Sequence, residues 1–282
     1  MIAICPNPYR DIDLAITRRC MEILTENGIE SAVCPVFAEA GSSAVPGDIS
    51  CTDIQTVAGD LSLAIVIGGD GTILSVVGSL YGKNIPVLGV NLGTMGFMAS
   101  IEAEDLNLIL NAARGEYPAV RRMMLDVFLT RKGRESYLGT VLNDAVIHGY
   151  GDTIVLNADC SGNSITSFSG DGIILSTPTG STGYSMSAGG PIVEPDTECI
   201  IISPICAHAI CSRSFVLSGE KTVSVSAEKL HDRKAYVSLD GNHECDFLPG
   251  DVLTVRRSEH SVSIIDPGIR SFYDTVFEKL TK

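Results

Sequence analysis

The fold is decided by the stretch Leu63-Ala64-Ile65-Val66-Ile67-Gly68-Gly69-Asp70-Gly71-Thr72. Its first five residues form a continuous apolar run, which is typical of a strand buried on both faces of a parallel sheet. A glycine-rich turn follows at once, and Ile73 to Leu80 has helical spacing. Because open α/β sheets bind ligands where a strand hands over to a helix, this turn is a candidate site.

The residues around this stretch repeat the alternation of strand and helix patterns, which predicts an α/β layer with a mainly parallel sheet. Further strands are predicted at Ile2–Cys5, Ile29–Val36 and Pro86–Val90, helices at Asp11–Glu26 and Glu104–Arg114, and an exposed loop at residues 40–52.

After this region the spacing of apolar residues changes from helical to alternating, which predicts short strands separated by turn residues. The predicted strands are Val127–Arg131, Tyr137–Leu142, Ile154–Leu156, Ile173–Leu175, Val223–Val225, Tyr236–Leu239, Val252–Val255 and Val262–Ile265. A closing helix over Ile269 to Lys282 is expected to pack back on the first domain. We therefore predict an α/β domain at residues 1–100, joined by 266–282, and a β-rich domain at 101–265.

Composition limits the possible partners and the compartment. The chain has 34 acidic and 20 basic residues and a net charge of −14, which opposes binding to nucleic acid or to an anionic membrane surface. Its nine cysteines form no CxxC pair and are scattered, which favours free thiols in a reducing compartment. No apolar run approaches the roughly 18 residues that span a bilayer. We expect a cytoplasmic protein with neither nucleic-acid nor membrane partners.

Asp70 is the unusual residue of the glycine-rich turn. Glycines let the backbone approach a phosphate closely, and the following helix start supplies free N–H groups. A carboxylate beside a phosphate repels it, so Asp70 is better explained as a base, a hydroxyl ligand or a magnesium contact. The alternative is a tight turn in which Asp70 caps the helix.

A second candidate segment is rich in small and hydroxylated residues. It reads Thr177-Pro178-Thr179-Gly180-Ser181-Thr182-Gly183-Tyr184-Ser185-Met186-Ser187-Ala188-Gly189-Gly190-Pro191. Such a loop and helix start offers hydroxyls and amides to a polar, flat ligand, with Tyr184 able to pack on a ring. The alternative is a surface loop, but Met186, Ala188 and Ile192 favour a packed segment.

Two shorter segments, Leu142-Asn143-Asp144 and Gly170-Asp171-Gly172, are turns by themselves and ligand contacts only by context. The five histidines, His148, His208, His231, His243 and His260, are dispersed, and none pairs with an acid at the spacing of metal ligands. Metal ligands therefore stay unassigned.

In their order along the chain these segments resemble the NAD kinase family, which phosphorylates the adenosine ribose 2′-hydroxyl of NAD to give NADP. The resemblance is also carried by Asn91-Leu92-Gly93 with Gly96-Phe97, and by Pro204-Ile205-Cys206-Ala207-His208. It implies a Rossmann-like N-terminal domain, a β-sandwich-like C-terminal domain, an NAD site between them, and a homo-oligomer, either a dimer or a tetramer.

The same resemblance implies the roles of individual residues. Asp70 would be the catalytic proton acceptor for the 2′-hydroxyl. The phosphate donor would bind at the loop of Gly68, Gly69, Gly71 and Thr72. The acceptor ribose would be lined by Gly71 and Phe97, and the ribose and adenine would be held by Asn143 and Asp144. The dinucleotide would also contact Thr182, Gly183, Tyr184 and Ser187, and its nicotinamide end would contact Asp171. Gly183, Asp144, Ser169 and Ala207 depart from the commonest family pattern, and Ser169 leaves open how the pyrophosphate is neutralised.

The resemblance leaves the donor open between ATP and polyphosphate. Because the turn at residues 68–72 has no lysine, we expect Mg²⁺ or another divalent metal to bridge the donor phosphates. Two rival classes remain. A lipid kinase would need an apolar substrate cleft, and a non-catalytic dinucleotide sensor would tolerate the loss of Asp70.

Overall fold

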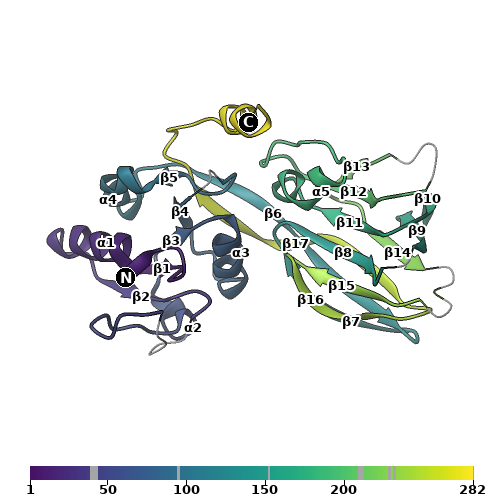
Figure 1. The fold of residues 1–282 in the computed structure, drawn as a ribbon, viewed down its shortest axis with the longest axis horizontal. Helices are drawn as coiled ribbons and strands as arrows, with labels where there is room; N and C mark the ends of the chain where they lie inside the picture. The colour runs from purple at the N-terminus through teal and green to yellow at the C-terminus, as the bar shows by residue number, and fades with distance from the viewer. Residues whose placement is uncertain are drawn as a thin grey trace. The chain divides into compact units, whose positions relative to one another are not determined.

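The computed structural model describes residues 1–38, 44–93, 96–151, 153–208, 213–227, 230 and 233–281. Residues 40–43 of the predicted loop, Thr94 and Met95, Cys211, His231 and Lys282 lie outside the described residues. The chain forms two compact units (Figure 1). Unit 1 comprises Met1–Arg121 and Ser261–Lys282, and unit 2 comprises Arg122–His260.

Unit 1 is built on a parallel sheet with the strand order β4-β3-β1-β2. These strands are β1 (Ile2–Pro6), β2 (Ser31–Val33), β3 (Leu63–Gly68) and β4 (Val87–Asn91). Every residue of β3 is buried, as its apolar run predicts. The short β5 (Ile101–Glu102) also pairs with β4. The predicted α/β layer is confirmed.

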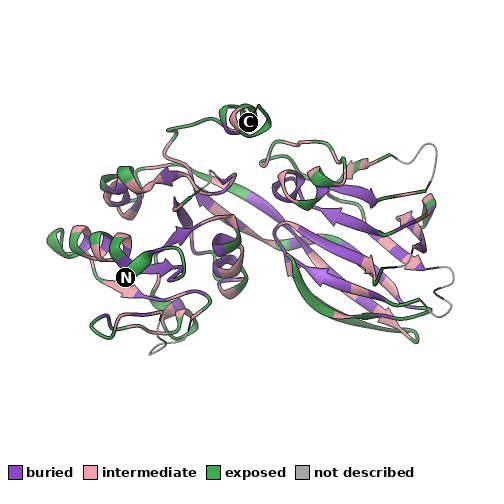
Figure 2. Ribbon diagram, in the orientation of Figure 1, coloured by how far each residue is buried: buried purple, intermediate pink, exposed green. Residues whose placement is uncertain are grey.

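The helices of unit 1 are α1 (Ala15–Glu26), α2 (Ile54–Val57), α3 (Asp70–Ser79), α4 (Ile109–Ala113) and α6 (Phe272–Leu280), with the 3-10 turns η1 (Ile12–Leu14), η2 (Ala58–Asp60) and η3 (Ala103–Leu108). Of these, α1 and α3 contact strands of the sheet. One core cluster joins Ile65 of the sheet to Cys20 of α1 and Ile109 of α4. Figure 2 shows β1, β3 and β4 as buried and the outer faces of the helices as exposed, whereas β2 at the edge of the sheet is only partly buried.

The first helix begins later than the sequence predicts. Asp11, expected as its first residue, caps it instead: the carboxylate accepts hydrogen bonds from the backbone N–H groups of Ile16 and Thr17, both at 2.9 Å. Asp13 and Leu14 have positive φ angles of 54° and 51°, which break the helix before Ala15. The predicted strand over Ile29–Val36 is also shorter in the structure, where β2 covers only Ser31–Val33. Beyond it, Cys34 N and Val36 N still donate to the carbonyls of Ile4 and Pro6, both at 2.8 Å.

Unit 2 is a sandwich of two antiparallel sheets, which confirms the predicted β-rich class. One sheet contains β10 (Asn163–Gly170), β9 (Ile154–Cys160), β14 (Val223–Ala227) and β17 (Val252–Ile265), with β6 (Ala119–Arg131) and β7 (Arg134–Val141) joined through β17. The other has the order β13 (Phe215–Ser218), β12 (Cys199–Ile205), β11 (Gly172–Ser176), β8 (Asp144–Gly149), β15 (Ala235–Leu239) and β16 (Asn242–Phe247). One core cluster takes side chains from both sheets, among them Leu156, Ile173 and Val225.

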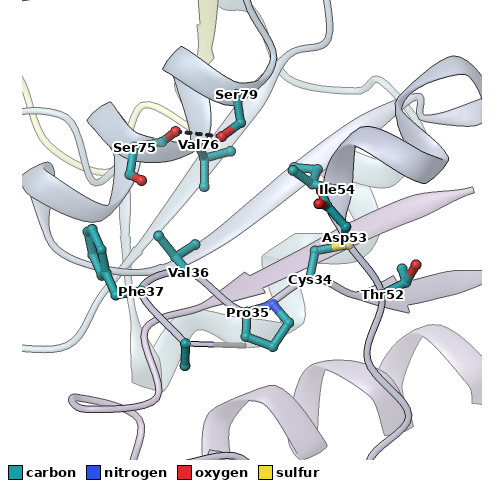
Figure 3. Close-up of a pocket in the computed structure, with 11 residues that line it drawn as sticks. Cys34, Pro35, Val36, Phe37, Thr52, Asp53, Ile54, Ser75, Val76 and Ser79 are labelled. Carbon is teal, nitrogen blue, oxygen red and sulfur yellow. Dashed lines mark hydrogen bonds between the residues drawn. The ribbon is translucent and has the colours of Figure 1, made fainter. Parts of the chain in front are cut away.

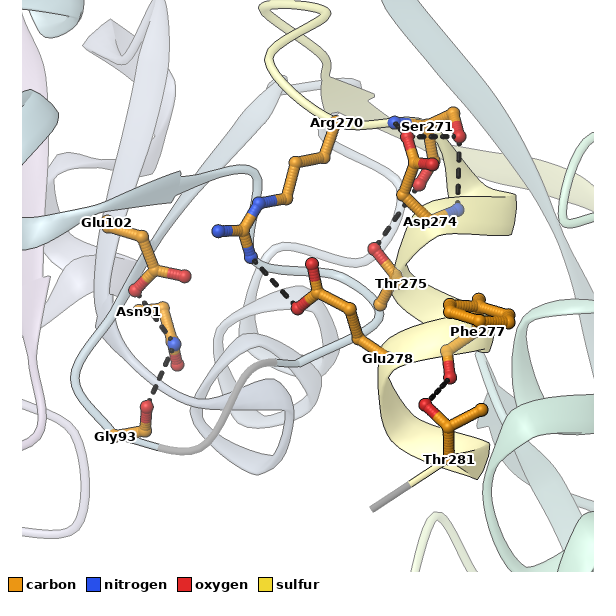
Figure 4. A network of polar contacts seen from close by, with 10 residues as sticks. All are labelled: Asn91, Gly93, Glu102, Arg270, Ser271, Asp274, Thr275, Phe277, Glu278 and Thr281. Atoms are coloured by element: carbon orange, nitrogen blue, oxygen red, sulfur yellow. Dashed lines mark hydrogen bonds and ion pairs between the residues drawn. The ribbon is translucent and has the colours of Figure 1, made fainter.

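The C-terminal helix packs on unit 1, as the sequence predicts. Ser271 caps it by accepting a 3.1 Å hydrogen bond from the N–H of Asp274, whose carboxylate accepts one from the N–H of Ser271 (Figure 4). The Phe272 ring lies 6.2 Å from that of Phe97, and Lys279 Nζ lies 4.2 Å from the Phe97 ring centroid. These contacts tie α6 to the segment that follows β4.

Two further observations concern the chain as a whole. In the described part of the chain, no helix has the length and apolar character that crossing a membrane requires. The described cysteines are all free, and of these Cys206 alone is exposed.

Candidate functional site

The glycine-rich turn is closed by its own threonine. Gly69 is the N-cap of α3, and Thr72 Oγ1 accepts hydrogen bonds of 3.4 Å from Gly69 N and from Nδ2 of Asn7. A Cβ on Gly68 would lie 2.4 Å from Thr72 Oγ1, so the strand can turn this tightly only at a glycine. Gly71 is exposed and has open space around it. The free backbone N–H groups at the start of α3 are therefore accessible to a ligand.

Asp70 does not cap its own helix. Its carboxylate reaches the segment after β4 and accepts hydrogen bonds from Phe97 N at 2.8 Å and Met98 N at 3.1 Å. A Cβ on Gly96 would lie 2.1 Å from Asp70 Oδ1, so this approach requires glycine there. Each carboxylate oxygen can accept more than one hydrogen bond, which leaves Asp70 able to bind a hydroxyl as well.

Asn91 carries an unsatisfied oxygen at the same end of the sheet. It pairs in register with Gly68, and its Nδ2 donates to Glu102 Oε2 at 3.0 Å and to the Gly93 carbonyl at 3.2 Å (Figure 4). Its Oδ1 is buried and has no partner among the described residues. Leaving a buried acceptor unpaired costs about 1–3 kcal/mol, so Asn91 Oδ1 is a candidate ligand for a group bound at this end of the sheet.

Arg10 is a candidate site residue that is not predicted from the sequence. It follows β1, where its N–H donates to the Asn7 carbonyl at 2.9 Å. Its guanidinium Nη1 lies 3.1 Å from the position of a Cβ on Gly69 and 3.6 Å from that of a Cβ on Gly93. The side chain is exposed and no hydrogen bond or ion pair joins it to the described residues. Nearly sixty residues separate Arg10 from the turn, so local patterns carry no signal for this juxtaposition.

In unit 2 the candidate residues gather on the outer face of one sheet. On β8, Ala145 and Ile147 point into the sandwich core, so Asp144, Val146 and His148 point outward. The pairing of β8 with β11 places Ser176 beside Asp144 and Gly172 beside His148. A small cluster joins Val146 to Ala188, the residue that ends the helix α5 (Tyr184–Ser187). The two motifs around Asn143 and Thr177 therefore share one surface.

The turn after β11 folds tightly on Asn143. The Asn143 carbonyl accepts from Thr177 N at 2.9 Å, and Thr177 Oγ1 donates to the Leu142 carbonyl at 2.5 Å. A Cβ on Gly180 would lie 2.2 Å from the Asn143 carbonyl oxygen. Asn143 Oδ1 and Thr179 Oγ1 are buried without a hydrogen-bond partner among the described residues. Because buried polar atoms are nearly always hydrogen-bonded, these two oxygens make the turn a candidate region for hydrogen bonds to a ligand.

Asp240 is a second residue that the sequence analysis missed. Its carboxylate accepts three backbone hydrogen bonds, from Leu142 N at 2.9 Å, Asn143 N at 2.8 Å and Asp144 N at 3.1 Å. In the sequence it resembles an ordinary Asp-Gly hairpin turn, which it also is, since it lies between β15 and β16.

The two buried carboxyls beside this turn are coupled. Burial raises the pKa of Asp144 to about 7, and the nearby charge of Asp240 adds to the rise. Burial also raises the pKa of Asp240, but its three N–H donors oppose that rise. Asp240 is therefore the member of the pair that carries the negative charge, and Asp144 is the one that titrates near neutrality.

An aromatic row continues from Tyr184 across the same face. Tyr184 Oη and His148 Nε2 are 2.8 Å apart, and their rings stack at 5.5 Å. His148 also stacks on Tyr236 at 5.6 Å, and Tyr236 lies 4.8 Å from Tyr150 and 5.2 Å from His243. Burial lowers the pKa of His148, so its ring is neutral at pH 7. The sequence pattern alone does not assign His148 to the site.

The remaining predicted residues lie near this row. Asp171 is exposed between β10 and β11, and its carbonyl accepts a hydrogen bond from Gly149 N at 2.9 Å. Thr182 Oγ1 donates to the Thr179 carbonyl at 3.2 Å, and Ser187 is exposed on α5. Ser169 accepts from His208 N at 2.7 Å through its carbonyl. Within unit 1 the structure brings Asp70 to Phe97, and within unit 2 it brings Asn143 and Asp144 to the Thr177–Tyr184 segment.

Acidic clusters that could hold a metal by themselves are absent: in the described ranges no three His, Cys, Asp or Glu side chains are arranged to do so. Any divalent cation here would need ligands from a bound phosphate, as Mg²⁺ commonly does.

The titration of Asp144 gives a testable dependence of stability on pH. Its pKa of about 7 in the fold exceeds the ordinary value of 3.8, so between these values the folded chain holds a proton that the unfolded chain releases. The contribution of Asp144 to the free energy of unfolding is fully present below about pH 4 and is lost as the pH rises through about 7. We expect Asp144→Asn to flatten this slope and to be about 1–3 kcal/mol more stable than the wild type at pH 8.

Urea unfolding at several pH values measures this slope. Asp196→Asn, an exposed carboxyl in the same unit, is the matched control and should follow the wild type. Parallel slopes for the wild type and Asp144→Asn would show that Asp144 is ionised throughout.

Comparison with known proteins gives consistent matches along the chain. Residues 2–114 match the family model of the ATP-NAD kinase N-terminal domain, and residues 142–266 match that of the ATP-NAD kinase C-terminal domain. An NAD kinase from Lachnoclostridium phytofermentans is 36% identical over 282 residues, covering 96% of this chain and 95% of the relative. One from Geobacter sulfurreducens is 39% identical over 221 residues, covering 77% and 78%.

Two solved structures have the same fold. Yeast NADH kinase complexed with NADH superposes with a TM-score of 0.83 at 22% identity, covering 99% of this chain and 87% of that one. An NAD kinase from Archaeoglobus fulgidus in complex with ATP gives a TM-score of 0.78 at 25% identity, covering 100% and 99%.

Proposed function

This chain belongs to the NAD kinase family, a family of phosphotransferases, and on that basis we propose that it transfers the terminal phosphoryl group of ATP to the 2′-hydroxyl of the adenosine ribose of NAD. The products are NADP and ADP. The observation that carries the proposal is the Asp70 carboxylate, held by two backbone N–H groups at a turn open to phosphate.

Asp70 acts on the acceptor hydroxyl in this proposal. Positioning and charge neutralisation dominate phosphoryl transfer, so the carboxylate first orients the 2′-hydroxyl. It then takes the hydroxyl proton as the new oxygen–phosphorus bond forms and the bond to the ADP oxygen breaks. The N–H groups of Phe97 and Met98 keep the carboxylate in place during this step.

The acceptor itself binds to unit 2 in this proposal. Asn143 Oδ1 and Thr179 Oγ1 are unpaired and buried, and they would accept or donate hydrogen bonds to ribose hydroxyls. Asp144 would accept from a ribose or adenine donor once ionised. Tyr184 and His148 present stacked rings on which the flat parts of a dinucleotide can pack.

The donor phosphates would lie on the backbone at Gly69 and Gly71, at the start of α3, where the helix dipole favours anions. Arg10 supplies the positive side chain that the turn lacks. A bound Mg²⁺ would supply further neutralisation of the donor phosphates. The unpaired Asn91 Oδ1 and the Glu102 carboxylate beside it fit such an ion, because Mg²⁺ takes oxygen ligands and keeps several waters.

Replacing Arg10 tests the donor end. We expect Arg10→Ala to raise the KM for ATP about 10-fold or more, because a charge-assisted contact to phosphate is lost, and to change the KM for NAD less than about twofold. Arg10→Lys should recover part of the loss. Arg19→Ala, another exposed arginine of unit 1, is the control for net charge. An unchanged KM for ATP in Arg10→Ala would remove Arg10 from the donor site.

The function is tested directly with purified protein, NAD, Mg²⁺ and either ATP or polyphosphate, coupled to an NADP-specific dehydrogenase. NADP formation with ATP is the expected result. The same assay with NADH as acceptor decides the redox form that is used. If no donor yields NADP, the proposed function is wrong.

A further inference from the structure

Unit 1 contains a cavity of about 340 Å³ that none of the predicted site residues lines. It lies between residues 34–38, which follow β2, residues 52–54, and Ser75, Val76 and Ser79 of α3 (Figure 3). This volume falls in the range of roughly 300–1,000 Å³ typical of small-molecule sites. All of its lining residues belong to unit 1.

The walls combine apolar faces with polar edges. Val36 and Val76 supply aliphatic surface, and Phe37 is 56% exposed with its ring at the side of the cavity where Ser75 lies (Figure 3). Phe37 has a φ of 64°, an unfavourable conformation for a bulky residue, and such strain is more common at binding sites than elsewhere. An exposed aromatic ring beside an aliphatic slot suits a flat heteroaromatic ligand.

The polar groups of the cavity are available for hydrogen bonds. Ser75 Oγ and Thr52 Oγ1 have no hydrogen-bond partner among the described residues. Ser79 Oγ, by contrast, donates a hydrogen bond to the Ser75 carbonyl at 3.1 Å (Figure 3). Asp53 uses Oδ1 to accept from Gln55 N at 2.8 Å, which leaves its other oxygen open. Burial raises the pKa of the Cys34 thiol to about 11, so that wall is uncharged at neutral pH.

Two structural connections join the cavity to the glycine-rich turn at residues 68–72. Val76 follows Asp70 by six residues on one helix, a rise of about 9 Å, which a ribose and its phosphates can span. On the other wall, Val36 N donates to the Pro6 carbonyl at 2.8 Å, at the end of the strand that leads into the Arg10 loop.

From this geometry we infer that the cavity binds the base of the nucleoside triphosphate donor, with its phosphates running along the start of α3 to Gly69 and Arg10. The inference rests on the proposed function. The acceptor dinucleotide is assigned to the other unit, and an inorganic polyphosphate donor would leave the cavity empty.

Two variants test the inference, one that removes a wall and one that fills the cavity. Phe37→Ala and Ser75→Leu should each raise the KM for ATP about 10-fold while changing kcat and the KM for NAD less than about twofold. Phe277→Ala repeats the first substitution at a phenylalanine that is 70% exposed on α6, and should behave as the wild type. Calorimetric titration with ATP alone should show the same loss of affinity in the two cavity variants, and thermal unfolding checks that each is folded.

The outcomes separate this inference from the proposed function. An unchanged KM for ATP in whichever of the two variants folds overturns the inference, and so does an equal rise in the KM for NAD. If the wild type makes no NADP, the proposed function fails, and the calorimetric titrations still decide whether the cavity holds the base. ATP affinity that is equal in the wild type and both variants would then overturn the inference as well.

Discussion

Asp70→Asn is expected to lower kcat about 100-fold or more while leaving the dissociation constant for NAD within about threefold. Asparagine has nearly the shape of aspartate and keeps one oxygen to accept an N–H from Phe97 or Met98. It cannot take the 2′-hydroxyl proton, and it binds that hydroxyl without a negative charge. Coupled assays give kcat, and calorimetry gives NAD affinity.

A second role of Asp70 must be separated from this one. Its carboxylate also holds the segment at Gly96–Met98, and the amide of asparagine faces one of those N–H groups with a donor. Loss of that contact would appear as lower stability and a higher KM for NAD. Asp60→Asn, an exposed carboxyl before the opposite end of β3, controls for the change of charge. A kcat within tenfold of the wild type would leave Asp70 as a positioning residue only.

Gly180→Ala is expected to have the largest effect in unit 2. The added methyl group would meet the Asn143 carbonyl oxygen at 2.2 Å and its carbon at 2.6 Å, and buried backbone cannot move away as a flexible side chain can. We expect stability to fall by about 3 kcal/mol. Because a displacement of about 1 Å can cost 10²-fold, we expect kcat/KM for NAD to fall to a similar extent.

Gly59→Ala is the control for this substitution. A Cβ at Gly59 has nothing within 4 Å, so the variant should match the wild type in urea unfolding and in kinetics. Normal stability and NAD kinetics in Gly180→Ala would mean that the turn at Thr177–Gly180 can open without moving Asn143.

The strands that the sequence predicts are the ones with apolar runs. β3 and β11 are buried throughout, so burial dictates their composition. β10, β13 and β16 were not predicted, and all three lie at the edges of their sheets. The inner strand β12 was also not predicted, although it is buried throughout. An edge strand carries polar side chains on much of its surface, as Asn163–Gly170 does, so its alternation is weak. β17 was predicted as two strands, because charged residues such as Arg256 and Glu259 interrupt its apolar pattern.

The candidate site could be predicted from the sequence where it consists of a local motif, and not where it depends on distant segments that meet in the fold. The turn at Gly68–Thr72 and the segment at Thr177–Tyr184 stand out because small and hydroxylated residues are poor core formers. Arg10 and Asp240 do not, since an arginine after a strand and an aspartate in a hairpin are ordinary locally. His148 was not predicted as a site residue because it is one outward-facing residue of an apolar strand, and its neighbours follow only from the register of β8.

The distribution of thiols has a practical consequence for solution work. Among the described cysteines, burial raises the pKa of Cys5, Cys20, Cys34, Cys51, Cys199 and Cys245, which protects them from alkylating reagents. Cys206 is exposed, so a maleimide dye can reach it, and because a hydrogen bond to Asp171 raises its pKa, labelling would need mildly alkaline conditions. Such a dye would lie beside Asp171, so its fluorescence could follow ligand arrival at that end of the aromatic row in real time.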